Sequence, residues 1–154
     1  MSKRTKNSRK DIALQRINDR ITETKADSSL LSFNYKYFLF GEDYGESFQE
    51  WEKEKILADL NEKLKVFSAK TAVELEQDGT LERFDSFPSD SEFSEPPALK
   101  EKTNITWARL RITGGRRLIG FLMKAQGELL GKEVFYIVFL DKNHRFAPYT
   151  KKGT

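Results

Sequence analysis

The residues best suited to chemistry lie in the last third of the chain. Residues 99–154 contain 12 Lys or Arg and 4 Asp or Glu, together with the only histidine of the protein. A guanidinium group bonds two phosphate oxygens at once and stays ionised, whereas imidazole titrates near neutral pH. Such a set could cleave RNA without a metal ion, by activating a 2′-hydroxyl for attack on the adjacent phosphate. The candidate catalytic residues are Arg109, Arg111, Lys142, His144 and Tyr149.

A second group of residues could hold RNA without reacting with it. Arginines at strand positions and turns can bind phosphate, and an aromatic ring such as Trp107 or Tyr149 could stack on an exposed base. The candidate RNA-binding residues are Arg116, Arg117, Trp107 and Arg145. RNA or the ribosome is therefore the expected partner.

Other interpretations fit the same residues. Arginines that alternate along a strand are commonly the solvent face of a sheet, and a lone histidine at a strand end is commonly a surface residue. The basic sheet could also bind nucleic acid, the ribosome or a topoisomerase without catalysis. A third hypothesis is a small interaction module whose sheet contacts only proteins.

Composition narrows the class of protein. The chain has no cysteine and one histidine, which excludes disulfides and Cys-ligated metals and argues against a zinc site. We expect neither a cofactor nor a metal. No apolar run has the length of a membrane span, and the basic N-terminus lacks the apolar stretch of a signal peptide. We therefore expect a cytoplasmic protein that does not contact a membrane.

Charge is distributed unevenly along the 154 residues. Residues 1–10 carry a net charge of +5, residues 74–95 carry −7 and residues 96–154 carry +8. This separation predicts a basic face for a polyanion and an acidic segment that could shield it. We predict a flexible basic tail at 1–10 and a single domain at 11–150, which includes an acidic, proline-containing loop at 78–98.

Hydrophobic periodicity predicts the elements before that loop. Apolar residues at helical spacing predict a helix over 11–25, and alternating aromatics predict a strand over 30–40, with Phe33, Tyr35, Tyr37 and Leu39 on one face. Ser47 and Glu50 form a capping box for a helix that should run to about residue 68. A second helix could cover 69–76.

The basic third of the chain predicts a three-stranded meander over 103–112, 116–124 and 134–140. Alternation places Ala108, Leu110 and Ile112 in the core, and Trp107, Arg109 and Arg111 on the opposite, exposed face. The third strand is almost wholly apolar, as in a central strand buried on both sides. The predicted fold is α+β: an antiparallel four-stranded sheet, made of one N-terminal strand and this meander, with helices packed on one face.

This order of elements resembles the RelE/ParE toxin superfamily. The resemblance is carried by the strand Trp107-Ala-Arg-Leu-Arg111, by Gly115-Arg-Arg117 before an apolar strand, and by an apolar final strand that runs into Asp141-Lys-Asn-His144. It covers roughly residues 30–150.

What the resemblance implies is an RNA-cleaving toxin that often acts on messenger RNA in the ribosome and is held inactive by a cognate antitoxin protein. It implies that Arg109, Arg111 and Arg117 bind phosphate, and that Lys142, His144 and Tyr149 are the acid and base candidates. Some members of the superfamily inhibit gyrase and have no nuclease chemistry. The long acidic loop and the N-terminal helix depart from the family pattern.

Overall fold

The computed structural model of the chain describes residues 9–16, 29–124 and 132–148. Residues 9–16 are helical and exposed, and this stretch covers the first part of the helix predicted over 11–25. The rest of that helix, most of the basic tail and Tyr149 lie outside the described residues. Within the described part of the chain, no helix is long and apolar enough to cross a membrane.

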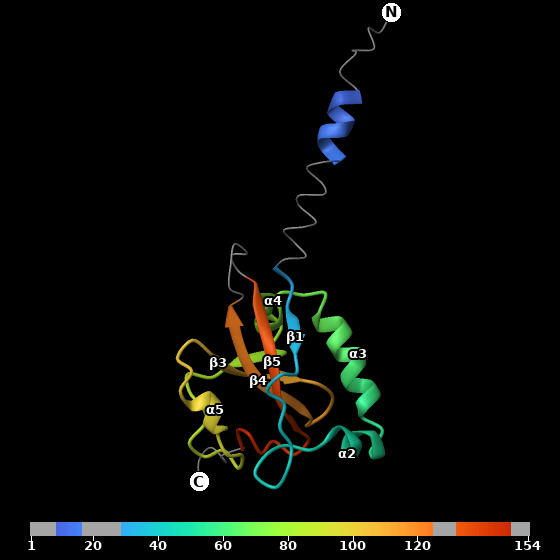
Figure 1. Cartoon of the computed structure of the whole chain (residues 1–154). Helices are drawn as coiled ribbons and strands as arrows, with labels where there is room; N and C mark the ends of the chain where they lie inside the picture. Colours follow the sequence, from blue (N-terminus) through green and yellow to red (C-terminus); the bar gives the residue numbers. More distant parts are fainter. Residues whose placement is uncertain (1–8, 17–28, 125–131, 149–154) are drawn as a thin grey trace, which may run out of the picture.

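The described domain is α+β, built around a five-stranded mixed sheet in the order β1-β5-β4-β3-β2 (Figure 1). The elements are β1 (Ser32–Asn34), α2 (Phe48–Lys53), α3 (Leu57–Phe67), α4 (Ala72–Gln77), β2 (Leu81–Arg83), α5 (Pro97–Lys100), β3 (Thr106–Arg111), β4 (Arg117–Lys124) and β5 (Glu133–Asp141). The predicted class and the meander β3-β4-β5 are confirmed. The antiparallel four-stranded description was wrong, because β1 pairs parallel to β5 and β2, within the predicted acidic loop, adds a fifth strand beside β3.

The strand predicted over 30–40 is only three residues long. After Asn34 the chain turns, since the Asn34 side chain accepts a hydrogen bond from the Lys36 amide and Tyr35 accepts one from the Phe38 amide. The turn divides the residues after it between the two faces of the sheet, and Phe38 stays in the core under the helices. Phe33 packs with the core under the helices, whereas Tyr37 and Leu39 pack on the opposite face, so the shared face was a wrong prediction.

The helix predicted from the Ser47 capping box begins as expected but ends early. Ser47 and Glu50 form the reciprocal capping bonds, and α2 stops before Lys55, whose backbone is left-handed with φ 60°. In a continuous helix Ile56 would lie about 140° around the axis from Trp51. The break in the helix changes this angle, so both residues enter the same core. Trp51 is 0% exposed there and Ile56 is 3% exposed.

The sheet has a hydrophobic core on each face. Helices α2, α3 and α4 cover one face, and Figure 1 shows the segment that carries α5 on the opposite side from α3. Ala108, Leu110 and Ile112 lie in the helix-covered core, as predicted. The other face was expected to be exposed, but Trp107 lies there in a second core with Phe121 and Phe139.

The second core is covered by the segment that follows β2. Phe84, Phe87 and Phe93 of that segment contribute their rings, and Phe146 from the C-terminal turn packs among them. Phe87 meets Trp107 edge to face, with ring centroids 5.0 Å apart. Aromatic residues in a polar, proline-containing segment therefore anchor it on the sheet.

Burial predicts that both faces of β3 stabilise the domain. We expect Leu110→Ala to lower the free energy of unfolding by about 2–5 kcal/mol and Trp107→Ala by about 3–5 kcal/mol, because each leaves a cavity. Arg111→Ala, at an exposed position of the same strand, should change it by less than about 0.5 kcal/mol. Urea unfolding followed by fluorescence and circular dichroism measures all three. A small effect of Trp107→Ala would contradict the second core.

Candidate functional site

One end of the sheet gathers most of the predicted site residues. Register places Arg111 of β3 opposite Arg117 of β4, and Arg117 opposite Asp141 of β5. Arg109 lies two residues back on the same face as Arg111. The turn between β3 and β4 and the turn after β5 both start at this end, at the bottom of Figure 1. The three arginines therefore converge where His144 leaves the sheet.

Asp141 builds the turn that carries His144. Its carboxylate is 1% exposed and accepts hydrogen bonds from the backbone amides of Arg145 at 2.9 Å and Phe146 at 2.9 Å. A carboxylate that holds successive amides fixes a tight turn. Within it His144 adopts a left-handed backbone with φ 56°, a conformation in which histidine is enriched relative to most residues. The backbone of this turn is therefore fixed, and it sets the position from which the His144 side chain extends.

The imidazole of His144 packs on the turn between β3 and β4. A Cβ atom built on Gly115 would lie 3.2 Å from His144 Nε2 and 3.3 Å from Cδ2, so only glycine leaves ordinary room for the ring. Burial lowers the pKa of His144, and the positive charges of Arg117, Arg109 and Arg111 lower it further, against the opposing effect of Asp141. His144 is therefore neutral at pH 7 and able to accept a proton.

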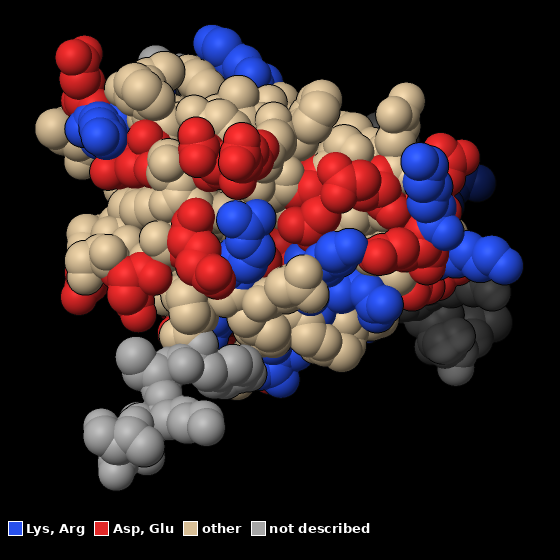
Figure 2. Space-filling view, turned by 90° about the horizontal axis from the view of Figure 1, so that it is seen from below, with Lys and Arg blue, Asp and Glu red and all other residues tan. Residues whose placement is uncertain are grey.

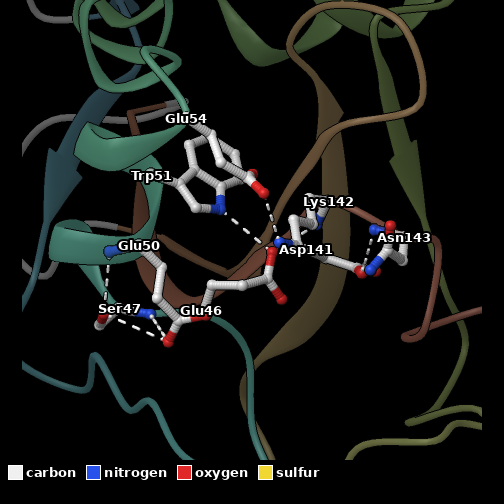
Figure 3. A network of polar contacts seen from close by, with 8 residues as sticks. All are labelled: Glu46, Ser47, Glu50, Trp51, Glu54, Asp141, Lys142 and Asn143. Carbon is white, nitrogen blue, oxygen red and sulfur yellow. Dashed lines mark hydrogen bonds and ion pairs between the residues drawn. The ribbon is translucent and has the colours of Figure 1, made fainter.

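Lys142 is held by helix α2 (Figure 3). Its Nζ donates to Glu54 Oε1 at 2.8 Å, and this contact raises its pKa, so the side chain stays protonated. Its backbone amide donates to Glu46 Oε1 at 2.7 Å, and the same oxygen accepts from Trp51 Nε1 at 3.0 Å. Burial raises the pKa of Glu46, although both of these hydrogen bonds act in the opposite direction. Lys142 is positioned as a cation, which suits phosphate binding better than proton abstraction.

An open cavity of about 670 Å³ lies beside His144. Its lining residues come from three places far apart in the sequence: the end of α2, the turn between β3 and β4, and the turn after β5. They are Glu54, Gly115, Arg116, Lys142 and Asn143. Since Gly115 also contacts the His144 ring, the cavity and the imidazole share a wall.

Acidic side chains accompany the basic ones at this end of the molecule. Figure 2 looks onto it and shows Lys and Arg among Asp and Glu rather than a uniformly basic surface. Glu82, from the acidic segment, accepts hydrogen bonds from Arg109 at 2.7 and 3.0 Å. The expectation that the acidic segment could shield basic residues therefore has one concrete instance, at Arg109.

Two predicted residues do not join this cluster, and a third cannot be placed in it or outside it. Trp107 is 4% exposed among Phe87, Phe121, Phe139 and Phe146, so its ring serves the second core and is not available to stack on a base. Arg145 lies over the Phe93 ring at 5.0 Å, on the covering segment. Tyr149 lies outside the described residues. Arg117 belongs to the cluster but is buried, and it donates to the carbonyls of Gly114 and Arg116.

Sequence reasoning missed the acidic members of the site. Glu54 and Glu46 precede Lys142 by 88 and 96 residues, and no local pattern connects them. Gly115, Asp141 and Asn143 belong to the motifs that carry the family resemblance, but nothing in the sequence gives a reason to assign them a role. Glu46 directly precedes Ser47, the residue that caps α2. A carboxylate at that position is the one sequence feature that could have directed attention to this site.

The positions of the arginines predict how the pKa of His144 changes in two variants. Arg111→Gln removes a positive charge that acts on the imidazole, so the His144 pKa should rise toward its ordinary value of 6.5. Lys124→Gln, at the far end of β4, should leave it unchanged. The imidazole proton resonances followed by NMR against pH measure both. An unchanged His144 pKa in Arg111→Gln would show that the arginine charge does not reach the ring.

Comparison with known proteins gave no match: no protein-family model, no curated protein and no solved structure is significantly similar to this chain.

Proposed function

We propose that the protein is a RelE-like toxin of a toxin–antitoxin pair, a metal-independent endoribonuclease that acts on messenger RNA, either free or on the ribosome, with a cognate antitoxin as its inhibitor. The observation that supports this most is the environment of His144. A partly buried imidazole, kept neutral at pH 7, lies beside three arginines and a cavity lined by Arg116 and Lys142. A neutral base beside several fixed cations is the arrangement that phosphodiester transfer needs.

The proposed reaction follows from these positions. His144 accepts the proton of a ribose 2′-hydroxyl, and the 2′-oxygen bonds to the adjacent phosphorus. The bond from phosphorus to the 5′-oxygen breaks, and that oxygen takes a proton from Lys142 or solvent. Arg111, which is exposed, and Lys142 stabilise the negative charge on the phosphate oxygens. Arg117 is buried, so it acts through its charge on His144 rather than by touching RNA.

Incubation with RNA in EDTA tests the proposal. The assay is run in two arms, one with ribosomes and one without. We expect cleavage to products with 2′,3′-cyclic phosphate ends. His144→Gln should slow cleavage by roughly 10²- to 10⁴-fold while RNA binding persists, because only the base is lost. Arg111→Ala should weaken binding and slow cleavage, whereas Lys124→Ala is the matched control at the far end of the sheet. Expression of the wild-type chain should arrest growth.

The pH dependence gives an independent check. A base must be unprotonated, and the His144 pKa is lowered, so the cleavage rate should reach half its maximum at a pH below 6.5. A rate that rises only above pH 8 would exclude His144 as the base.

One alternative predicts different results in the same assays. A non-enzymatic protein that binds nucleic acid, the ribosome or a topoisomerase through this end of the sheet would arrest growth and bind RNA without cleaving it. His144→Gln would then have little effect, and Arg111→Ala would still weaken binding. RNA binding without cyclic-phosphate products, both with and without ribosomes, would support this alternative and exclude the nuclease.

A further inference from the structure

The cavity beside His144 has polar groups whose hydrogen-bonding capacity is unused. Within the described residues, the Arg116 guanidinium and the Asn143 side-chain amide make no hydrogen bond, and Glu54 bonds Lys142 through Oε1 only. Glu54 Oε2 takes no part in that ion pair, and the Glu54 side chain lines the cavity and is 44% exposed. A hollow with unused donors and acceptors from three separate elements has the composition of a polar ligand site.

The donor and acceptor set narrows the ligand. Arg116 and Lys142 bring two positive charges, which suit a phosphate. Glu54 brings a carboxylate, which accepts hydrogen bonds and repels other acceptors. A matching ligand therefore carries a phosphate and, some distance from it, a group with N–H donors. A nucleotide has both parts.

The carboxylate distinguishes among the four bases. The Watson–Crick edge of guanine has two adjacent donors, N1–H and N2–H, which fit the two oxygens of one carboxylate. Adenine and cytosine each place one N–H beside a ring nitrogen that would face the carboxylate with a lone pair. Uracil places its N3–H between two carbonyl oxygens. Guanine is the base that meets Glu54 without an acceptor facing an acceptor.

We propose that this cavity is a guanine subsite for RNA, in which Glu54 accepts hydrogen bonds from N1–H and N2–H while Arg116 and Lys142 hold the phosphate. The inference rests on the proposed function, since it names the nucleotide that the same site selects. Gly115 lines this cavity and also lies against the His144 ring, so a nucleotide held there would have its ribose and phosphate near the proposed base. Asn143 supplies a second polar contact at the base edge.

Binding to unreactive nucleotides tests the subsite apart from cleavage. The full chain is titrated calorimetrically with the four 2′-deoxynucleoside 3′-monophosphates, which lack the attacking hydroxyl. We expect the guanine nucleotide to bind about tenfold or more tightly than each of the others, the discrimination of a good bidentate contact. Glu54→Gln should reduce this preference to within about twofold, because its amide replaces one acceptor oxygen with a donor.

Glu54→Gln should not weaken the binding of the other three nucleotides, because it releases Lys142 from its ion pair. The matched control is Glu52→Gln, an exposed glutamate of α2 outside the cavity lining, which should keep the full preference. Arg116→Gln is the second variant, and it should weaken all four nucleotides to a similar degree while guanine remains preferred. Thermal melts confirm that each variant is folded.

The outcomes separate this inference from the proposed function. Equal affinities for the four nucleotides, no binding at all, or an unchanged preference in folded Glu54→Gln would each overturn the guanine subsite, whatever the RNA cleavage assay shows. Guanine preference that depends on Glu54, in a protein that cleaves no RNA, would support the subsite and refute the nuclease. If Glu54→Gln does not fold, a wild-type preference for guanine with uniform weakening in Arg116→Gln still supports it, and a wild type without preference overturns it.

Discussion

One carboxylate oxygen joins the helical layer to the functional end of the sheet. Glu46 Oε1 accepts from the Trp51 indole of α2 and from the Lys142 backbone after β5, in a site where the glutamate is only 7% exposed. Gly45 makes this approach possible, since a Cβ at that position would collide with the Leu140 carbonyl. A buried acceptor that holds two donors is costly to remove, because both would lose their partner. The placement of α2, of Lys142 and of the cavity wall follows from this contact.

The two cores determine where the basic residues can act. On the second face of the sheet, Trp107, Phe121 and Phe139 fill the region under the covering segment, and arginines occupy the rows nearest the turns. Each core buries one set of alternating positions along the strands, and Arg111 and Arg117 lie where β3 ends and β4 begins. The candidate chemistry therefore lies at this end of the sheet.

The parts of the fold that local patterns determine were predictable. Alternation in β3 placed Leu110 in the helical core, and the Ser47 capping box placed the start of α2. Alternation alone cannot show that a second layer covers the other face, and for that reason Trp107 was assigned to RNA rather than to a core. Local patterns cannot predict the parallel pairing of β1 with β5 either, because it depends on contacts between residues about 100 positions apart in the chain.

The site was predictable on its basic side and not on its acidic side. His144 and the arginines share a short stretch of sequence with a visible charge excess, and the structure brings Arg109, Arg111 and Arg117 to the imidazole. Glu54 has no local feature that distinguishes it from Glu52. Only the left-handed residue at Lys55, which ends α2 there, places Glu54 at the cavity. Long-range pairing, rather than residue type, decides which glutamate matters.

The parallel pairing of β1 and β5 has a consequence for the order in which the chain folds. β5 pairs with both β1 and β4, and it is synthesised after every other described strand and helix. A nascent chain that ends before Glu133 can form the cap of α2 and the hairpin of β3 and β4, but it has nothing for β1 to pair with and no Lys142 for Glu54 to hold. Pairing across such sequence separation is slow because a long loop must close first. The candidate site is thus assembled last, after translation has passed its final strand, and an unfinished polypeptide lacks both the cavity and the imidazole.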